Sequence, residues 1–331
     1  MRKGWLFNLR PFLTASNVNP LPFGSLIEQR EEEAPAGGLY VLPYVVNLTT
    51  VLCNTELFAA EGIRLPGLDW TWTEFLMTAK RLTRSIGGVP VRGLAASYWG
   101  LVEEWLPKGT AAPSPEEFRQ ALGQVGGRAG AMLRVPSFLL PTTGAPGQTE
   151  VFLHVEQSAA AAERWSAFAR GRVAMIMTGM SAWWLSRVAR QLPVRWTAVP
   201  TPHFVGVSGE VGVGASVLGA AAATRAPEAV WTFINWAAGP DGIVAFNPTG
   251  VPAYRSPQSE ARWLAAARPA TGLRWVFHTP LKIGGNLMAG GVLVSNALFD
   301  GINGVLYQGW SIDKAVTLYE TALRKAGVRF S

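Results

Sequence analysis

The chain has 331 residues, of which 49% are hydrophobic and 15% are charged, so it can bury a large core and is long enough for two lobes. Its single cysteine, Cys53, and three histidines far apart in the sequence exclude disulfide scaffolds and Cys/His zinc modules. The formal net charge of +7 arises from 29 Lys and Arg against 22 Asp and Glu, but no dense Lys/Arg run is present, so we expect no nucleic-acid partner.

The N-terminal segment, residues 1–37, carries four prolines and several aromatic residues without a sustained period, which predicts an irregular connector. It starts with basic residues but reaches Asn8, Arg10 and Pro11 before an apolar core can form, so it lacks the pattern of a secretory signal peptide. An uncharged stretch in the C-terminal part of the chain, 283–299, contains several glycines and two asparagines. We expect it to form a buried loop and a helix rather than a membrane span.

Two short apolar strands are the first regular elements that the sequence predicts, at 39–42 and 45–52, with Pro43 between them. Asn54 is placed to cap a short helix, and Gly62 is placed to end it.

Longer helices are marked by capping residues at their starts. Thr71-Trp72-Thr73-Glu74 is a capping box, and apolar residues then recur at helical spacing as far as Leu82. Other helices are expected to begin at Ser114, Ser158, Thr224 and Ser311. In the helix after Thr224, the residues expected to face inward are Val230, Phe233, Ile234 and Ala237.

Short strands at 173–177 and 196–200, and a flexible glycine-rich run at 206–219, lie between these helices. Strands interleaved with amphipathic helices indicate α/β architecture. No internal repeat is present.

Several short motifs follow one another along the chain. In the first half they are GLYVLPY at 38–44, CNTELF at 53–58 and WTWTEF at 70–75. In the second half they are FARGRVAM at 168–175, VPTP at 199–202, APEAVWTF at 226–233 and GVPA at 250–253. Taken in this order, they resemble the motifs of sugar-type extracellular solute-binding proteins of ABC importers, and the resemblance covers nearly the whole chain from Gly38 onward.

The resemblance implies an α/β, two-lobed periplasmic-binding-protein-like fold with a hinge, in which each lobe has its own sheet. The expected division is a connector at 1–37, the remainder of an N-terminal lobe at 38–101, a C-terminal lobe at 102–205, and a hinge-crossing segment with C-terminal helices at 206–331.

Two departures from the family pattern concern the start of the chain and Cys53. Compared with the family pattern, we expect the segment before Gly38 to lack the signal peptide, the lipoprotein cysteine and the first strand-helix-strand unit of the N-terminal lobe. We therefore expect an incomplete N-terminal lobe with an uncovered sheet edge, from a truncated gene or a misplaced start. Cys53 stands where the family usually has tyrosine.

The chain's fourteen tryptophans favour a carbohydrate ligand, because indole rings match the C–H faces of pyranoses. Most of them, including Trp72, Trp165 and Trp231, are expected in the core. The candidate ligand-binding aromatic residues follow a strand or a turn: Tyr44, Trp99, Trp183 and Trp184.

Two further candidates are Gly214, which lies in the glycine-rich run, and Arg255, which follows the turn at 250–252. Gly214 could let a ligand approach closely or act in a hinge. Arg255 could hydrogen-bond a sugar or an anion, although a lone surface arginine is the alternative interpretation.

The expected function is capture of a carbohydrate between two lobes, outside the cytoplasm, and its delivery to the membrane permease subunits of an ABC importer. The expected ligands are monosaccharides, oligosaccharides, sugar phosphates and polyols. No catalytic residue, metal or cofactor is expected, because nucleophile–base pairs, paired carboxylates and metal-ligand spacings are lacking. A truncated remnant or scaffold that binds no ligand is the alternative. A carbohydrate hydrolase is the third interpretation.

Overall fold

The computed structural model describes residues 4–16, 19, 21–32, 37–86, 89–96, 112–126, 159–180, 191–203, 211–246, 250–267, 272–283 and 292–328. The chain divides into two compact units. The first unit comprises Met1–Thr49, Gly179–Gln191 and Glu210–Ile283, and the second comprises Thr50–Thr178, Leu192–Gly209 and Gly284–Ser331. Each unit is assembled from separate stretches of the chain. The boundaries of these stretches differ from the boundaries of the four segments expected from the sequence.

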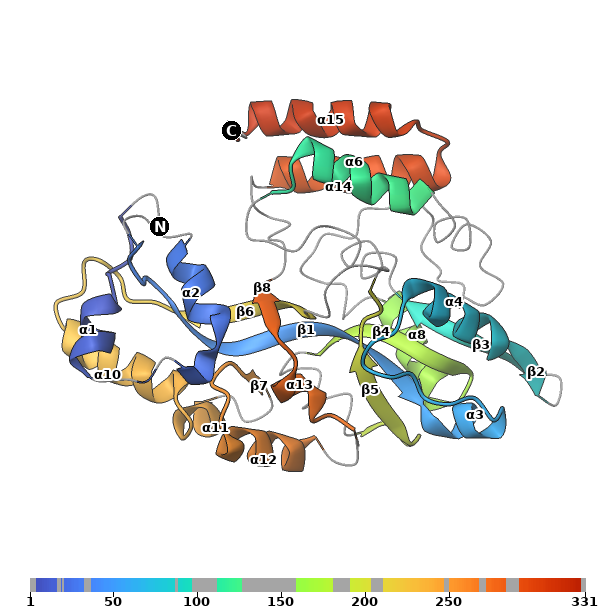
Figure 1. The fold of residues 1–331 in the computed structure, drawn as a ribbon, viewed down its shortest axis with the longest axis horizontal. Coiled ribbons are helices and arrows are strands. Elements are labelled where there is room, and N and C mark those ends of the chain that lie inside the picture. Colours follow the sequence, from blue (N-terminus) through green and yellow to red (C-terminus); the bar gives the residue numbers. More distant parts are fainter. Residues whose placement is uncertain are drawn as a thin grey trace. The chain divides into compact units, whose positions relative to one another are not determined.

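The described residues contain an eight-stranded mixed sheet (Figure 1). Its strands are β1 (Leu42–Asn54), β2 (Arg84–Ile86), β3 (Val89–Ala96), β4 (Val173–Met180), β5 (Trp196–Pro200), β6 (Val211–Leu218), β7 (Val251–Pro252) and β8 (Leu281–Ile283). The strand order is β2-β3-β4-β1-β6-β8, and β5 and β7 also pair with β1. The expectation of a separate sheet for each lobe is therefore wrong.

The reason for the single sheet is the length of β1, which has 13 residues. The sequence predicted two strands broken at Pro43, because proline lacks the N–H that a central strand donates. Instead, the register against β6 shifts between Pro43 and Val45, so a bulge absorbs the irregularity and the strand continues. Residues up to Thr49 belong to the first unit, and those from Thr50 belong to the second.

The glycine-rich run at 206–219 was expected to be flexible, but its residues 211–218 form β6. This strand pairs antiparallel with β1 on one side and parallel with β8 on the other. Ladder hydrogen bonds on both sides outweigh the low strand propensity of glycine, which is why propensity alone gave the wrong expectation.

The N-terminal segment is not an irregular connector, because it forms three short helices: α1 (Arg10–Ala15), η1 (Leu21–Phe23) and α2 (Ser25–Glu32). Leu9, Phe23 and Leu26 are each at most 2% exposed. The backbone N–H of Phe7 donates to the carbonyl of Ala220 at 2.8 Å. Such short helices bury too few residues each to produce a visible period in the sequence.

The rest of the first unit contains α10 (Pro227–Ala238), α11 (Gly242–Phe246), α12 (Pro257–Ala266) and α13 (Trp275–His278). Two details of α10 differ from expectation. Thr224 does not cap it, since the N-cap residue is Ala226 and makes no side-chain capping bond. Phe233 does not face inward but is 45% exposed, whereas Trp231 and Ile234 are buried.

In the second unit, several helices begin where the sequence placed their caps. Asn54 accepts from the N–H groups of Glu56 and Leu57 at the start of α3 (Thr55–Ala60), and the Thr71–Glu74 capping box opens α4 (Trp72–Arg81). The remaining helices are α6 (Pro115–Gly126), α8 (Ala159–Ala169), α14 (Val292–Tyr307) and α15 (Ile312–Lys325). These agreements reflect the local nature of capping.

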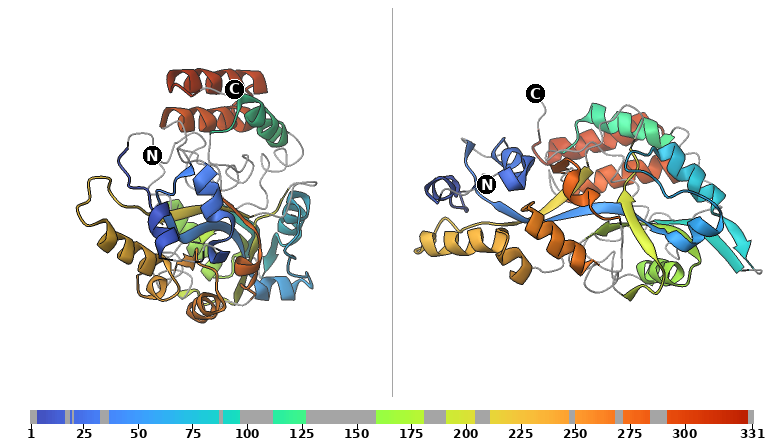
Figure 2. Two further views of the ribbon diagram at one scale, coloured as in Figure 1. Left: turned by 60° about the vertical axis from the view of Figure 1, so that its left-hand side comes forward. Right: turned by 60° about the horizontal axis from the view of Figure 1, so that its bottom comes forward.

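The helices α14 and α15 lie side by side with α6 packed against both (Figures 1 and 2). Tyr319 of α15 is fully buried, donates its hydroxyl to the carbonyl of Pro113 at 2.7 Å, and contacts the ring of Phe118. The start of α14 covers residues 292–299 of the uncharged stretch, and residues 284–291 lie outside the described part of the chain.

Candidate functional site

Three of the six candidate ligand residues, Tyr44, Gly214 and Arg255, lie in the described part of the first unit. Tyr44 is on β1, Gly214 is on β6, and Arg255 follows β7. The other three, Trp99, Trp183 and Trp184, lie outside the described residues. Their roles remain predictions.

Gly214 lies opposite Asn47 in the antiparallel pair of β6 and β1. The amide nitrogen of Asn47 donates to the hydroxyl oxygen of Ser216 at 3.2 Å, so two polar side chains meet beside a glycine. Asn47 and Ser216 are partly exposed and Gly214 is exposed. We call these three residues the polar face.

The fold itself does not require a glycine at position 214. A Cβ atom there would meet no atom closer than the carbonyl oxygen of Asn47 at 3.7 Å, which is an ordinary contact, and the backbone φ is not in the left-handed region. A glycine at an exposed strand position leaves its backbone accessible to close approach by a ligand.

Asn47 and Ser216 were not among the residues expected at the site from the sequence. A signal was present for Asn47, because it is a polar residue within an apolar strand between Val46 and Leu48. A polar side chain in such a strand usually has a hydrogen-bond partner or a ligand. Ser216 gave no comparable signal, since its partner is distant in the sequence.

Tyr44 lies at the bulge of β1, three residues before Asn47. Its carbonyl oxygen accepts from the N–H of Ala253 at 3.0 Å, which fixes the strand to the turn after β7. Its ring lies 5.3 Å from the ring of Phe246 in an edge-to-face arrangement, and the side chain is partly exposed. Tyr44 therefore presents part of its ring and is held in place by α11.

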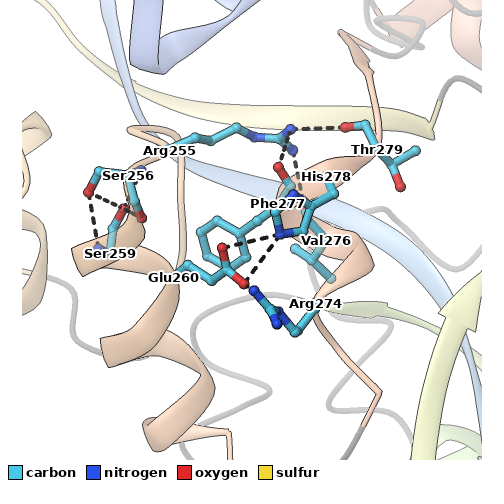
Figure 3. A network of polar contacts seen from close by, with 9 residues as sticks. All are labelled: Arg255, Ser256, Ser259, Glu260, Arg274, Val276, Phe277, His278 and Thr279. Carbon is cyan, nitrogen blue, oxygen red and sulfur yellow. Dashed lines mark hydrogen bonds and ion pairs between the residues drawn. The ribbon is translucent and has the colours of Figure 1, made fainter.

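Arg255 is neither unpaired nor on an open surface (Figure 3). Its guanidinium donates to the carbonyl oxygens of Val276 at 2.8 Å, Thr279 at 2.9 Å and Phe277 at 3.3 Å. The alternative of a lone surface arginine is therefore wrong. Burial lowers the pKa of Arg255 to about 10, which still leaves it charged at neutral pH. Its three bonds satisfy carbonyls at the end of α13, and they favour a structural role over the expected ligand contact.

Glu260 on α12 is the centre of a second part of this network (Figure 3). Its carboxylate accepts from Arg274 Nε at 2.9 Å and lies 3.3 Å from His278 Nε2. Desolvation raises the pKa of Glu260, but hydrogen bonds from Arg274 and His278 together outweigh it, so the pKa lies below its usual value. These contacts tie α12 to α13, and the Ser256–Ser259 capping box satisfies backbone N–H groups at the start of α12.

The polar face carries no ionisable side chain. The polar face offers an amide and a hydroxyl, both uncharged at neutral pH. Within the described stretches, no group of three or more His, Cys, Asp or Glu side chains could hold a metal ion. Cys53 is fully buried, and burial raises the pKa of its thiol well above the usual range, so it is not an activated nucleophile.

No described helix is long and apolar enough to cross a membrane. A comparison with curated protein sequences gives no match.

Solved structures share this fold at low sequence identity. A sugar transporter protein from Rhizobium etli in an open conformation is similar with a TM-score of 0.72 and 19% identity, over 98% of this chain and 81% of that chain. An ABC substrate-binding protein from Listeria monocytogenes in complex with cycloalternan has a TM-score of 0.67 and 17% identity, over 99% and 82%. A solute-binding protein from Agrobacterium vitis with bound D-mannitol has a TM-score of 0.57 and 17% identity, over 98% and 81%.

These similarities confirm the expected α/β, periplasmic-binding-protein-like fold. The sequence model for bacterial extracellular solute-binding proteins matches residues 1–243, which is well over half of the chain. The chain therefore belongs to the bacterial extracellular solute-binding protein family.

Proposed function

We propose that this chain captures a carbohydrate outside the cytoplasm and presents it to the membrane subunits of an ABC importer. Membership of an extracellular solute-binding family supports a binding role and this location. Similar structures from other bacteria are described as a sugar transporter protein and as binding proteins for cycloalternan, D-mannitol and tagatose. These descriptions support a carbohydrate or polyol ligand.

The observation that carries this proposal is the polar face of Asn47, Gly214 and Ser216. Asn47 has both donor and acceptor capacity, and Ser216 holds its amide in a fixed orientation at 3.2 Å. Sugar hydroxyls are themselves donors and acceptors, so an uncharged amide–hydroxyl pair matches them without the cost of burying a charge. Tyr44, on the same strand, supplies an aromatic surface for the C–H face of a sugar ring.

The mechanism is binding coupled to a conformational change, with no chemistry performed on the ligand. A ligand that has higher affinity for one conformation of the protein shifts the population toward that form. The importer then distinguishes loaded from empty protein by this form. Trp99, Trp183 and Trp184 are further proposed contacts to the sugar.

The test combines a ligand panel with Gly214→Ala. Monosaccharides, polyols and oligosaccharides are titrated by calorimetry, and one or more should bind. Gly214→Ala should weaken binding about tenfold or more, which corresponds to about 1.4 kcal/mol. The melting temperature should not fall, because the added Cβ meets only ordinary contacts. Asn47→Ala should also weaken binding, through the lost hydrogen bonds.

Gly67→Ala is the matched control, since Gly67 is an exposed loop glycine where a Cβ atom would meet nothing closer than 4.0 Å. It should change neither affinity nor stability. Failure of the unsubstituted protein to bind any sugar or polyol would contradict the proposed function. Normal affinity in both Gly214→Ala and Asn47→Ala would contradict the polar face as the site. Hydrolysis of aryl glycosides would instead identify an enzyme.

A further inference from the structure

Basic side chains of the second unit gather near the edge of the sheet at which β3 and β4 begin. These two strands are parallel, with Arg92 of β3 in register with Val173 of β4, so both start at this edge. The C-terminal end of α4 lies against β3 close to the same place (Figure 1). We call this group the basic edge, and its members are Lys80, Arg81, Arg84, Arg92, Arg170 and Arg172.

Backbone contacts bring the strands and the turn of the basic edge together. The N–H of Arg92 donates to the carbonyl oxygen of Arg172 at 2.9 Å. Arg84 of β2 pairs with Val91, the residue that precedes Arg92. These arginines are far apart in the sequence, so they do not form a dense Lys/Arg run, and only the fold shows that they belong to one surface.

The C-terminal end of α4 is fixed on β3 by close packing. A Cβ atom on Gly93 would clash with the carbonyl oxygen of Ala79, so the glycine lets the helix lie directly on the strand. The hydroxyl of Thr83 donates to the carbonyl oxygen of Ala79 at 2.9 Å and accepts from the N–H of Gly93 at 3.0 Å. Lys80 and Arg81, in the last turn of α4, are therefore held beside the arginines of the strands.

Most of the positive charge of the basic edge is not neutralised by the protein. Arg84 forms an ion pair with Glu61. Within the described stretches, no ion pair or hydrogen bond involves the side chains of the exposed members, which are Lys80, Arg81, Arg170 and Arg172. A helix C-terminus favours basic residues in its last turn, which accounts for those of α4 but not for those on the strands and the turn. The surplus charge is available to an anionic partner.

The chemistry of the basic edge favours phosphate groups on an extended surface. A guanidinium presents paired N–H donors that match phosphate oxygens, and five of the six members are arginines. They come from separate segments and most are exposed, as suits a surface that carries many phosphates. The aromatic residues of α4, Trp72 and Phe75, are buried and cannot stack on bases, which disfavours single-stranded nucleic acid. Lipid headgroups present phosphates without bases.

We infer that the basic edge is an electrostatic contact surface for the phosphate headgroups of an anionic lipid membrane. The contact keeps the chain close to the bilayer that holds the importer subunits, through an attraction that weakens as the salt concentration rises. The inference goes beyond the proposed function and takes from it only the location of the chain beside the importer. It requires no carbohydrate, so it is tested in the absence of a ligand.

The experiment measures binding of the full chain to lipid vesicles by co-sedimentation. Vesicles of phosphatidylcholine with about one third phosphatidylglycerol should bind the protein at low salt, and vesicles of phosphatidylcholine alone should not. A variant that combines Lys80→Gln, Arg81→Gln, Arg170→Gln and Arg172→Gln should bind the anionic vesicles about a hundredfold more weakly, because each basic residue near an anionic surface contributes severalfold. Raising the salt to about 0.5 M should release the unsubstituted protein.

The matched control removes the same charge elsewhere on the protein. It also replaces one lysine and three arginines, all of them exposed, by combining Arg225→Gln, Arg262→Gln, Arg324→Gln and Lys325→Gln. It should bind the anionic vesicles far more tightly than the basic-edge variant does. A second variant, with Arg81→Lys, Arg170→Lys and Arg172→Lys, keeps the charge and should retain most of the binding. Circular dichroism of each variant checks that it is folded.

The outcomes distinguish this inference from the proposed function. No binding of the unsubstituted protein to anionic vesicles at low salt overturns the inference and leaves carbohydrate capture unaffected. Equal weakening by the basic-edge variant and the matched control means that net charge alone attracts the protein, and it also overturns the inference. Binding to double-stranded DNA or polyglutamate, without binding to vesicles, would assign the basic edge to an anionic polymer instead and would likewise overturn it.

Discussion

Replacing Arg255 by methionine tests whether this residue supports the fold or contacts the ligand. Methionine keeps the long apolar stem but removes all three hydrogen bonds to the carbonyls of Val276, Phe277 and Thr279. Hydrogen bonds from a charged donor contribute about 1.5–3 kcal/mol each in favourable cases, and bonds that share one donor group are not additive. Water can partly replace the lost donors, because the side chain is only half-buried.

We therefore expect Arg255→Met to lower the free energy of unfolding by about 3 kcal/mol. At about 2–4 °C per kcal/mol for a domain of 150–250 residues, the melting temperature should fall by about 6–12 °C. Arg255→Lys should recover little, because an ammonium group cannot reach three carbonyls with the geometry of a guanidinium.

The assay is urea denaturation monitored by circular dichroism, together with sugar titration of the folded fraction. Arg195→Met is the control, since its side chain is 84% exposed and pairs with Glu56 at the surface. It should cost less than about 1 kcal/mol. If Arg255→Met leaves stability unchanged and abolishes sugar binding, then Arg255 is a ligand residue and the structural argument is wrong.

Two further predictions concern stability. Trp231→Ala should lower the free energy of unfolding by roughly 3–5 kcal/mol. Trp231 is only 5% exposed, and its indole N–H donates to the hydroxyl oxygen of Ser16 at 2.7 Å. An unchanged urea denaturation curve would refute this prediction. Glu260→Gln should lower the free energy of unfolding at neutral pH. The difference in free energy of unfolding between the variant and the unsubstituted protein should shrink as the pH falls below about 4. The pKa of Glu260 is lowered in the folded protein, so its stabilising charge is lost on acidification. Denaturation curves across this pH range check the sign, and a difference that grows toward low pH would contradict it.

Features specified by nearby residues were predictable from the sequence. The Thr71–Glu74 capping box and the caps Asn54 and Ser311 are confirmed, because each involves a side chain and backbone N–H groups within three residues. The buried strand at 173–177 is likewise confirmed as part of β4. Local geometry suffices in each of these examples.

Features that depend on distant partners were missed. The strand β6 forms because β1 and β8 pair with it. Its glycines have low strand propensity, so the sequence did not predict a strand there. Phe233 was expected inside because it falls on the apolar stripe of α10, yet its neighbours are Trp236 and Phe246 at the surface. An apolar stripe shows which face of a helix is apolar, but it does not show which residues at the edge of that face are buried.

The candidate site was predictable only in part for the same reason. Tyr44 and Gly214 were found from the motif and the glycine-rich run. Their neighbour Asn47 was missed, because its significance depends on Ser216, which is distant in the sequence and becomes adjacent only through the register of β1 and β6.

The continuity of β1 has a consequence for attempts to divide the protein. A boundary between Thr49 and Thr50 would cut a single strand whose first part pairs with β6 and β7 and whose last part pairs with β5. Each fragment would then expose a cut strand end with unpaired backbone groups, which favours aggregation. Expression of either unit alone is therefore a poor way to study ligand binding, and substitutions in the intact chain are the appropriate tool.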